Sequence, residues 1–562
     1  MNLDRFLFLY NPLRCSFRNN QEEVIDKLAD FMEDPSKRYF LCEAPTGSGK
    51  SLIALTLSRY LRFEKKKSCF ITSSKNILLD QYAKDYDKYI SIMKGKSNYP
   101  CLALKNTNYE EAPCQSQNKF KCKFSEACPY KCALKQALKD PIVFTNLYFL
   151  LLDIEYAKRF GKRDLLIIDE AHSIESILID YRTVSYTENN IKKVNDILKR
   201  IKEEEFLPYK STRKYYAGNY EMIPASELKN INIDNLDEVN GLLRKIHSFL
   251  DTLFASMYGM DDNINVEELN KYELEDYKQF IKDINYIKNF ALRIENYLDN
   301  KDENEYICLP YFAKKSKKHT GFELKPIDAS GLAQKILHKI ADKIIFMSAT
   351  IGNKEMFCKN IGIDPLQTDS LSIESDFPIK NRPIYRPYVG NYNIKTKDEY
   401  LKKAIPIIDK IIESHPNMKG VIHTSNYEDA DYIYQHSKYM KRIMVHTPKD
   451  RNLIINSFLK SKNGILCSPS CYEGLDLKDD LARFQIIFKI PWGNLGDKLV
   501  KKRMEKDKDW YINTTAIQFC QAVGRAIRSK NDWANTFVLD QSFERLRNSK
   551  FLTDYIKKSI VN

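Results

Sequence analysis

The segment FLCEAPTGSGKS places a short apolar run before a glycine-rich loop and a lysine–serine pair. Gly47 and Gly49 allow the backbone to curl so that its N–H groups point at phosphate oxygens, and Lys50 supplies positive charge to the terminal phosphates. Ser51 can ligate Mg²⁺ at the N-terminus of the helix that the following residues predict. Ala44 stands where the general pattern has its first glycine. The nucleotide-binding residues predicted here are Ala44, Pro45, Thr46, Gly47, Ser48, Gly49, Lys50 and Ser51.

An acidic pair ends the apolar run in LLIIDEAH, where Asp169 can hold Mg²⁺ and Glu170 can position and polarise the attacking water. The alternative is a pair of capping residues in front of a helix. Ligands of open α/β sheets bind at the carboxyl ends of the strands. The glycine-rich loop and the acidic pair therefore predict one nucleotide site, with ATP and Mg²⁺ as its ligands.

The segment QFCQAVGRAIRS carries Gln521 and two arginines, Arg525 and Arg528, which are three positions apart on one helical face. Two guanidinium groups on that face could reach the terminal phosphate from across a cleft and stabilise charge in the transition state. The alternative is that both arginines form structural salt bridges. If two domains must close to engage the arginines, hydrolysis is coupled to domain motion, which is what a motor requires.

Apolar runs typical of β-strands alternate with helical patterns in two separate parts of the chain, which predicts two α/β domains with parallel sheets. Between them, residues 185–325 place apolar residues at helical spacing in segments 191–201, 242–257 and 277–298, which predicts a helical insertion. The predicted strands are 39–42, 69–72, 142–145 and 165–168 in the first domain and 420–423, 464–467, 484–490 and 536–539 in the second.

Length and charge limit the class of protein. The chain has 562 residues, enough for three or four domains, and Lys plus Arg exceed Asp plus Glu by 89 − 75 = 14. Such an excess favours a polyanionic partner, either nucleic acid or an anionic membrane surface. The apolar runs are shorter than the roughly 20 residues that cross a bilayer, and the first residues lack the pattern of a secretory signal. We therefore expect an intracellular protein without a membrane partner.

Five of the 13 cysteines fall within residues 101–132, and in a reducing compartment such clustering indicates metal binding. Structural zinc sites favour close cysteine pairs, and only Cys128 and Cys132 have that spacing. Four thiolates can hold a 4Fe-4S cluster without fixed short spacing. The spacing therefore favours an iron–sulfur cluster, with zinc and no metal as alternatives.

These segments resemble superfamily 2 helicases. The order APTGSGKS, DEAH, MSAT, CYEGLDL and QAVGRAIR matches helicase motifs I, II, III, V and VI over nearly the whole chain. The cysteine segment before DEAH is similar to the cysteine-bearing insertion of the XPD/DinG family. The resemblance implies an ATP-dependent DNA helicase with two RecA-like motor domains, a 4Fe-4S lobe and an Arch-like helical insertion, which acts as a monomer on single-stranded and forked DNA in the 5′ to 3′ direction.

The resemblance also implies roles for individual residues. Arg18 and Gln21 would read adenine, and Ser348 and Thr350 would link hydrolysis to domain movement. Segments 72–74 and 424–426 would hold the sugar-phosphate backbone of DNA. Glu473, Gly474 and Asp476 would lie beside nucleotide and strand. The cluster ligands would be Cys101, Cys114, Cys122 and Cys128, with Cys132 as a spare or as a replacement for one of them.

The implied domain limits are 1–94 and 136–184 for motor domain 1, 95–135 for the iron–sulfur lobe, 185–325 for the insertion, 326–380 for the end of motor domain 1 with a linker, and 381–562 for motor domain 2. Lysines of the cysteine lobe, with Tyr99, Tyr109 and Phe120, could form a basic aromatic rim around single-stranded DNA, or merely a solvated surface. Two other functions remain open. One is a translocase on duplex DNA or RNA that does not separate strands, and the other is a DNA-binding scaffold with weak catalysis.

Overall fold

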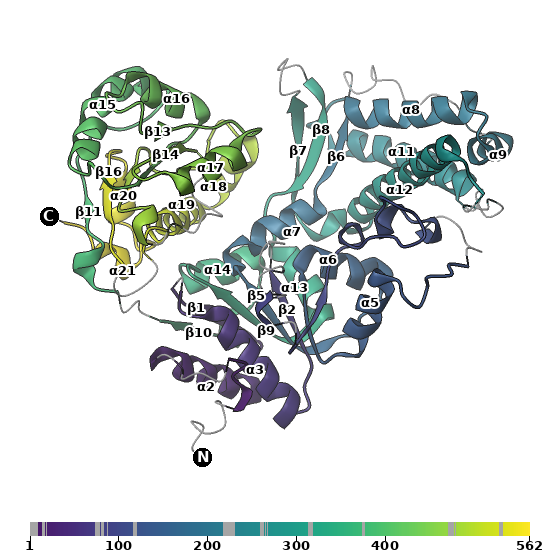
Figure 1. Cartoon of the computed structure of the whole chain (residues 1–562), viewed down its shortest axis with the longest axis horizontal. Helices are drawn as coiled ribbons and strands as arrows, with labels where there is room; N and C mark the ends of the chain where they lie inside the picture. The colour runs from purple at the N-terminus through teal and green to yellow at the C-terminus, as the bar shows by residue number, and fades with distance from the viewer. Residues whose placement is uncertain are drawn as a thin grey trace.

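The computed structural model describes residues 9–561 except 14–16, 18, 46, 74–78, 80–81, 83, 87, 116–120, 217, 219–230, 259–263, 265, 267, 313–318, 374–376, 470–476, 478 and 528–531. Two parallel-sheet domains and an insertion with helices and a small sheet make up the described part (Figure 1). We call the first sheet with its helices domain 1 and the second domain 2.

Domain 1 is built on a seven-stranded sheet with the order β10-β1-β9-β5-β2-β4-β3, and every pairing in it is parallel. On the central strand β5, Leu166 packs in one buried apolar cluster, and the next residue, Ile167, packs in another on the opposite face of the sheet. Both faces are therefore covered, as parallel sheets require. The strands are β1 (Tyr39–Glu43), β2 (Cys69–Ser73), β3 (Ser91–Met93), β4 (Ile142–Asn146), β5 (Arg163–Asp169), β9 (Ala341–Ser348) and β10 (Thr368–Ser372). The helices are α2 (Asn19–Glu33), α3 (Lys50–Glu64), α5 (Pro129–Lys139), α6 (Leu147–Leu152), α7 (Ile174–Arg182), α13 (Ser330–Ile340) and α14 (Lys354–Ile361).

Domain 2 has a six-stranded sheet, also parallel throughout, with the order β11-β16-β15-β12-β14-β13. Its presence confirms the predicted α/β class with two parallel sheets. The strands are β11 (Ile384–Tyr385), β12 (Gly420–His423), β13 (Ile443–Met444), β14 (Ile465–Ser468), β15 (Phe484–Ile487) and β16 (Asn535–Val538). The helices are α15 (Lys397–Glu413), α16 (Tyr427–His436), α17 (Arg451–Lys460), α18 (Lys498–Lys506), α19 (Lys508–Val523), α20 (Phe543–Arg547) and α21 (Asp554–Lys557).

The insertion between β5 and β9 contains the predicted helices and also a three-stranded antiparallel sheet, β6-β8-β7, that the sequence did not predict. Thr187 and Asn190 form a capping box at the start of α8, and Asn270 and Glu273 form another at the start of α12. The elements are β6 (Val184–Thr187), α8 (Glu188–Glu203), α9 (Leu207–Tyr215), α11 (Leu236–Met257), α12 (Lys271–Asn300), β7 (Tyr306–Phe312) and β8 (His319–Pro326).

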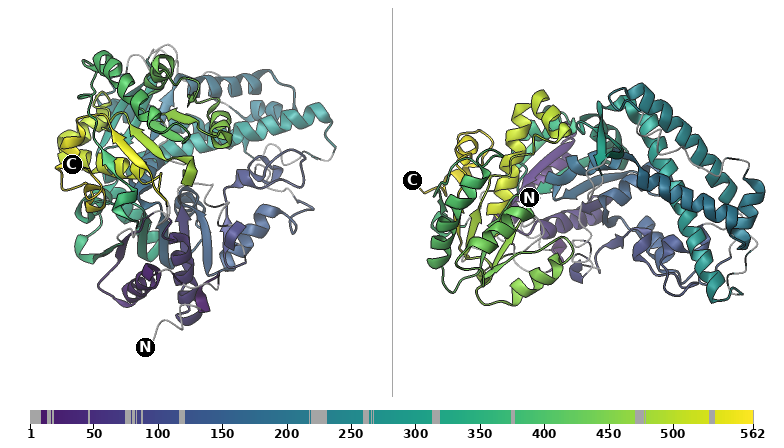
Figure 2. Two further views of the ribbon diagram at one scale, coloured as in Figure 1. Left: turned by 60° about the vertical axis from the view of Figure 1, so that its left-hand side comes forward. Right: turned by 90° about the horizontal axis from the view of Figure 1, so that it is seen from above.

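The cysteine lobe follows β3 and is mostly loops and single 3₁₀ turns, and it ends in α5. Asn285 Nδ2 on α12 donates to Glu110 O at 2.8 Å, and Leu104 packs with Tyr277 and Ile281 of the same helix. The lobe is therefore attached to the insertion as well as to domain 1. In the right-hand view of Figure 2, the insertion in teal extends to one side of domain 1, and domain 2 in green to yellow lies toward the other side.

No helix in the described ranges has the length and apolar character needed to cross a membrane.

Candidate nucleotide site and cysteine pocket

The glycine-rich loop joins the end of β1 to the first turn of α3. Gly47 has φ 83° and Gly49 has φ 82°, a left-handed conformation that side chains with a Cβ rarely adopt. A Cβ at Gly49 would also overlap Gln21 Nε2. Lys50 Nζ donates to Ala44 O at 3.2 Å, so the lysine closes the loop from inside. The local geometry explains why the sequence needs glycine at both positions.

The acidic pair lies at the carboxyl end of β5, beside strands β2 and β9. Asp169 is buried, and its pKa is raised first by burial and then by the charge of Glu170, while the charge of Lys50 opposes this rise. Glu170 adopts a left-handed conformation with φ 56°, and its N–H donates to Asp169 Oδ1 at 2.9 Å. Lys50 and Asp169 therefore share one site, as phosphate and Mg²⁺ binding requires.

The loop after β9 is tied to both of these segments. His172 Nδ1 lies 2.9 Å from Ser348 Oγ, and Ala44 N donates to Ser348 O at 2.9 Å. The carboxylate of Glu43, the residue before the glycine-rich loop, accepts the N–H groups of Ile351 and Gly352 at 2.6 and 2.9 Å. Three loops at one sheet edge thus form a single hydrogen-bonded unit.

Gln21 is buried against the glycine-rich loop, where its Nε2 donates to Ser48 O at 2.7 Å. Its contact with adenine stays a prediction. Of the other predicted residues, Arg18, Thr46, Arg528 and the set Glu473, Gly474 and Asp476 lie outside the described residues.

Helix α19 of domain 2 carries Gln521, ends just before Arg525 and packs against domain 1. A Cβ at Gly352 would lie 3.0 Å from Asn513 Oδ1 and 3.3 Å from Ile517 Cδ1 of this helix. The charge of Glu43 also contributes to the raised pKa of the Cys520 thiol, after burial. The helix therefore faces the residue that precedes the glycine-rich loop.

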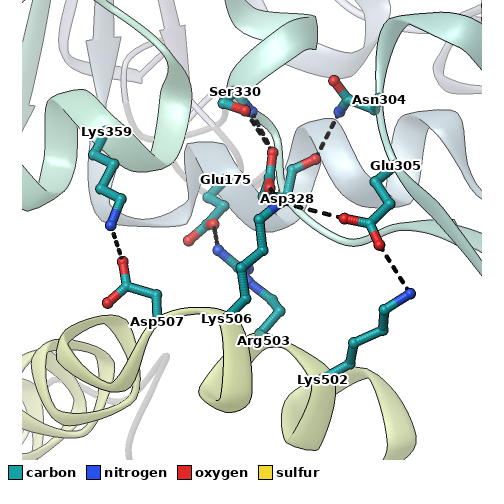
Figure 3. A network of polar contacts seen from close by, with 10 residues as sticks. All are labelled: Glu175, Asn304, Glu305, Asp328, Ser330, Lys359, Lys502, Arg503, Lys506 and Asp507. Carbon is teal, nitrogen blue, oxygen red and sulfur yellow. Dashed lines mark hydrogen bonds and ion pairs between the residues drawn. The ribbon is translucent and has the colours of Figure 1, made fainter.

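A row of ion pairs joins α18 and the start of α19 to domain 1 and to the insertion (Figure 3). Arg503 is paired with Glu175 on the first turn of α7, and its guanidinium lies 3.9 Å from the centre of the Trp510 ring. Trp510 Nε1 donates to the same carboxylate at 3.4 Å. The remaining pairs are Lys359–Asp507 at 2.5 Å, Lys502–Glu305 at 2.9 Å, Lys506–Asp328 at 3.0 Å and Lys506–Glu305 at 3.4 Å.

The four cysteines predicted as cluster ligands line one small pocket, together with Tyr109 and Phe124. Cys132 does not line it, because its thiol is exposed and its Sγ donates to Glu126 O at 3.1 Å. Helix α5 begins directly after Cys128, with Pro129 at its first position, where proline is favoured. The pocket lining is thus Cys101, Cys114, Cys122 and Cys128 without the fifth cysteine.

The four thiols of this pocket are the donor set that a 4Fe-4S cluster requires. Within the described ranges, no three Cys, His, Asp or Glu side chains converge closely enough to hold one metal ion. Four thiolates on a cubane each bind a different iron, so they surround the group instead of meeting at a point. The charges of Cys114 and Cys122 contribute to the raised pKa of Cys101, after burial, so these sulfurs face the same space.

The predicted aromatic rim for DNA does not fit the structure. Tyr109 is buried and stacks on Tyr130 with ring centroids 4.1 Å apart, and Tyr99 packs edge-on against the same ring at 5.5 Å. These tyrosines form a small aromatic core of the lobe instead of an exposed rim. In the segments expected to hold the DNA backbone, Thr72 and Thr424 are buried whereas Ser425 is exposed, and the contact of these segments with DNA stays a prediction.

Two family models match the chain. One is described as "Helicase C-terminal domain" and matches residues 408–559, and the other is described as "Type III restriction enzyme, res subunit" and matches residues 14–207. A probable ATP-dependent helicase of Methanocaldococcus jannaschii is 23% identical over 94% of this chain and 92% of its own. The ATP-dependent DNA helicase XPD of Sulfolobus acidocaldarius is 22% identical over 94% of this chain and 96% of its own. A solved XPD helicase structure superposes with a TM-score of 0.60 at 18% identity, covering 97% of this chain and 98% of the other.

Two parallel-sheet domains, a nucleotide site of this geometry and these matches define a superfamily 2 helicase. Within that superfamily, the chain is similar over nearly its whole length to XPD and DinG proteins.

Proposed function

We propose that this protein is an ATP-dependent DNA helicase that hydrolyses ATP between domains 1 and 2 and moves 5′ to 3′ on single-stranded DNA. One observation carries the proposal: α19 of domain 2 packs beside the loop unit that holds Lys50 and Asp169. The relatives of similar length are named as ATP-dependent helicases. The direction of movement rests on the family resemblance, and we keep the domain limits predicted from the sequence.

In this proposal each polar group of the site has one task. The N–H groups of the glycine-rich loop and Lys50 bind the phosphates, and Ser51 and Asp169 hold Mg²⁺, which screens phosphate charge when bound. Glu170 orients the attacking water and accepts its proton. Arg525, with Gln521 and Arg528 from the same segment, approaches the terminal phosphate from domain 2 and stabilises its developing charge.

We further propose that Cys101, Cys114, Cys122 and Cys128 hold a 4Fe-4S cluster. The lobe has few buried apolar residues of its own, mainly Leu104, Tyr109, Ala112 and Tyr130. A small lobe with so little core gains stability from a metal group that ties its loops together. We assign the cluster this structural role, and we attribute strand separation to movement of the domains.

Strand displacement on 5′-tailed, 3′-tailed and forked duplexes tests the proposal. We expect ATP-dependent unwinding of the 5′-tailed and forked substrates, little on the 3′-tailed one, and none with Lys50→Ala. ATP turnover stimulated by DNA without any displaced strand would instead favour a translocase. Unwinding of only the 3′-tailed substrate would overturn the direction. Normal turnover by Lys50→Ala would remove the assigned nucleotide site.

A further inference from the structure

A basic groove lies at the amino ends of the domain 1 strands, opposite the nucleotide site at their carboxyl ends. Segments 62–68, 138–141 and 159–163 surround a groove of about 580 Å³ that is open to solvent, which we call the basic groove. Ser68, Pro141 and Arg163 stand at the amino ends of β2, β4 and β5, whereas Asp169 stands at the carboxyl end of β5. At about 3.3 Å per residue, the seven-residue strand β5 separates the two sites by roughly 20 Å.

The lining of the basic groove carries excess positive charge. Seven of its fourteen residues are Lys or Arg and one is acidic, so a polyanion is the ligand that the groove favours. Some of these cations are neutralised, because Arg62 pairs with Asp140 at 3.4 Å and Lys162 with Asp342 at 2.6 Å. The other lysines of the lining are Lys66, Lys67 and Lys139, and none of them forms an ion pair with a described residue.

An exposed aromatic ring lies within this charged lining. Phe63 is 45% exposed, although its ring stacks on Tyr10, and the Arg62 guanidinium lies 5.3 Å from its centroid. Leu138, on the opposite wall, is 44% exposed. An aromatic face among unpaired cations is the combination with which proteins hold single strands, because bases stack on the ring while phosphates meet the cations. A solvated lysine surface would not require the exposed phenyl ring.

Helix α5 connects the basic groove to the cysteine lobe. It starts directly after Cys128 and ends at Lys139, and its 11 residues span about 16 Å. This helix lies on the side of domain 1 that faces away from domain 2 (Figures 1 and 2). A strand in the basic groove is therefore not the one held between the two domains.

We propose that the basic groove binds single-stranded DNA, and that its natural occupant is the strand displaced during unwinding. The identity of the occupant rests on the proposed helicase function, whereas binding of a single strand does not. Phe63 stacks on a base, and Lys66, Lys67 and Lys139 contact consecutive phosphates. By holding the displaced strand away from its complement, the groove favours forks over tailed duplexes that lack that strand.

The test is equilibrium binding of fluorescent DNA to the full-length protein, by anisotropy over a range of salt concentrations. The substrates are a fork with both tails and a duplex with only the 5′ tail. The groove variants are Phe63→Ala and the triple variant Lys66→Gln/Lys67→Gln/Lys139→Gln. Phe63→Tyr keeps the ring, and a triple variant of the exposed lysines Lys402, Lys410 and Lys438 of domain 2 matches the loss of charge. Thermal unfolding of every variant checks its folding.

Wild-type protein should bind the fork more tightly than the 5′-tailed duplex. Removing three phosphate contacts on a single strand should lower the slope of log K against log salt by about 2, and only on the fork. Phe63→Ala should weaken fork binding roughly tenfold, and Phe63→Tyr should restore it. Equal losses on both substrates, or no loss on the fork, would overturn the proposal.

Because binding needs no hydrolysis, these outcomes separate the groove from the motor. If wild type unwinds no substrate but the groove variants still lose fork binding, the helicase proposal fails and the single-strand site stands. A further substrate carries a duplex arm in place of the displaced single-stranded tail. If the triple variant binds this substrate more weakly than wild type does, the groove recognises phosphate backbone in general and the single-strand assignment is wrong.

Discussion

His172 Nδ1 lies 2.9 Å from Ser348 Oγ, which joins the loop after β5 to the loop after β9. Ser348 Oγ also accepts the N–H of Thr350 at 3.3 Å, and its carbonyl accepts the N–H of Ala44. A change at the acidic pair can therefore reach the segment around Gly352, where α19 of domain 2 packs. This gives a contiguous route from the phosphate site to the other domain.

Ser348→Ala tests this route. The change removes both hydrogen bonds of the hydroxyl but leaves Lys50, Asp169 and Glu170 in place. We expect ATP turnover to stay within about threefold of wild type while strand displacement falls at least about tenfold, since the lost contacts act on domain movement. Ser176→Ala, an exposed serine on α7, is the control. Equal loss of both activities would place Ser348 in the hydrolytic step instead.

The pair of Arg503 and Glu175 should matter more than its neighbours. Arg503 is nearly buried, stacked on Trp510, so Arg503→Gln leaves the Glu175 carboxylate without its counter-ion inside the domain interface. Lys359 is exposed and pairs with Asp507 at the edge, where ion pairs contribute little. We expect Arg503→Gln to reduce base pairs unwound per ATP at least about fivefold and Lys359→Gln to change it less than about twofold. Similar values for the two variants would show that the interface does not depend on the buried pair.

The cysteine pocket predicts which thiols hold iron. Cys122→Ser should remove iron and sulfide from anaerobically purified protein and should impair unwinding, because the lobe loses the group that ties its loops together. Cys132→Ser should keep both, since that thiol lies outside the pocket and contacts Glu126 O. Chemical iron and sulfide analysis measures the outcome. Loss of iron from Cys132→Ser would mean that the fifth cysteine is a ligand.

His423 predicts a pH dependence of folding in domain 2. Burial lowers the pKa of this histidine from 6.5 to about 4. As the pH falls, the histidine is therefore protonated in the unfolded chain before it is protonated in the folded protein. Its contribution to stability is present above about pH 6.5 and lost toward pH 4, and it amounts to about 2 kcal/mol between pH 7 and pH 5. Urea unfolding followed by tryptophan fluorescence reports it, because the tryptophans at 492, 510 and 533 all lie in domain 2. His423→Gln should flatten the curve. An unchanged slope in that variant would contradict the neutral, buried histidine.

The sequence predicted the strands of both parallel sheets well where an apolar run is bounded by breakers. Segment 420–423 coincides with β12, whereas 484–490 was too long, because β15 loses its strand neighbours after Ile487. The antiparallel sheet of the insertion was missed. Strand β7 includes Pro310, and in β8 the alternation of Phe322 and Leu324 with Glu323 and Lys325 is only four residues long and lies between Gly321 and Pro326, which are typical of turns.

Within the candidate site, the residues with a chemical signature could be found from the sequence, and those that connect elements could not. Lys50 and Asp169 belong to short patterns that specify their own local geometry. Glu43 and Glu175 act through partners far away in the chain, Gly352 and Arg503, and only the folded chain brings these pairs together. Tyr109 was misassigned for the same reason, since an exposed aromatic rim and a buried aromatic core have the same composition.

The central claim is that one catalytic site is completed by both domains, and the ATPase of Arg525→Ala tests it most directly. The account predicts that kcat falls about 10³-fold in the presence of DNA, as for other arginines that stabilise a phosphoryl transition state, while ATP affinity changes only a few-fold. The same measurement on Lys410→Ala, an exposed residue of α15, should match wild type. A kcat for Arg525→Ala within a few-fold of wild type would contradict the account.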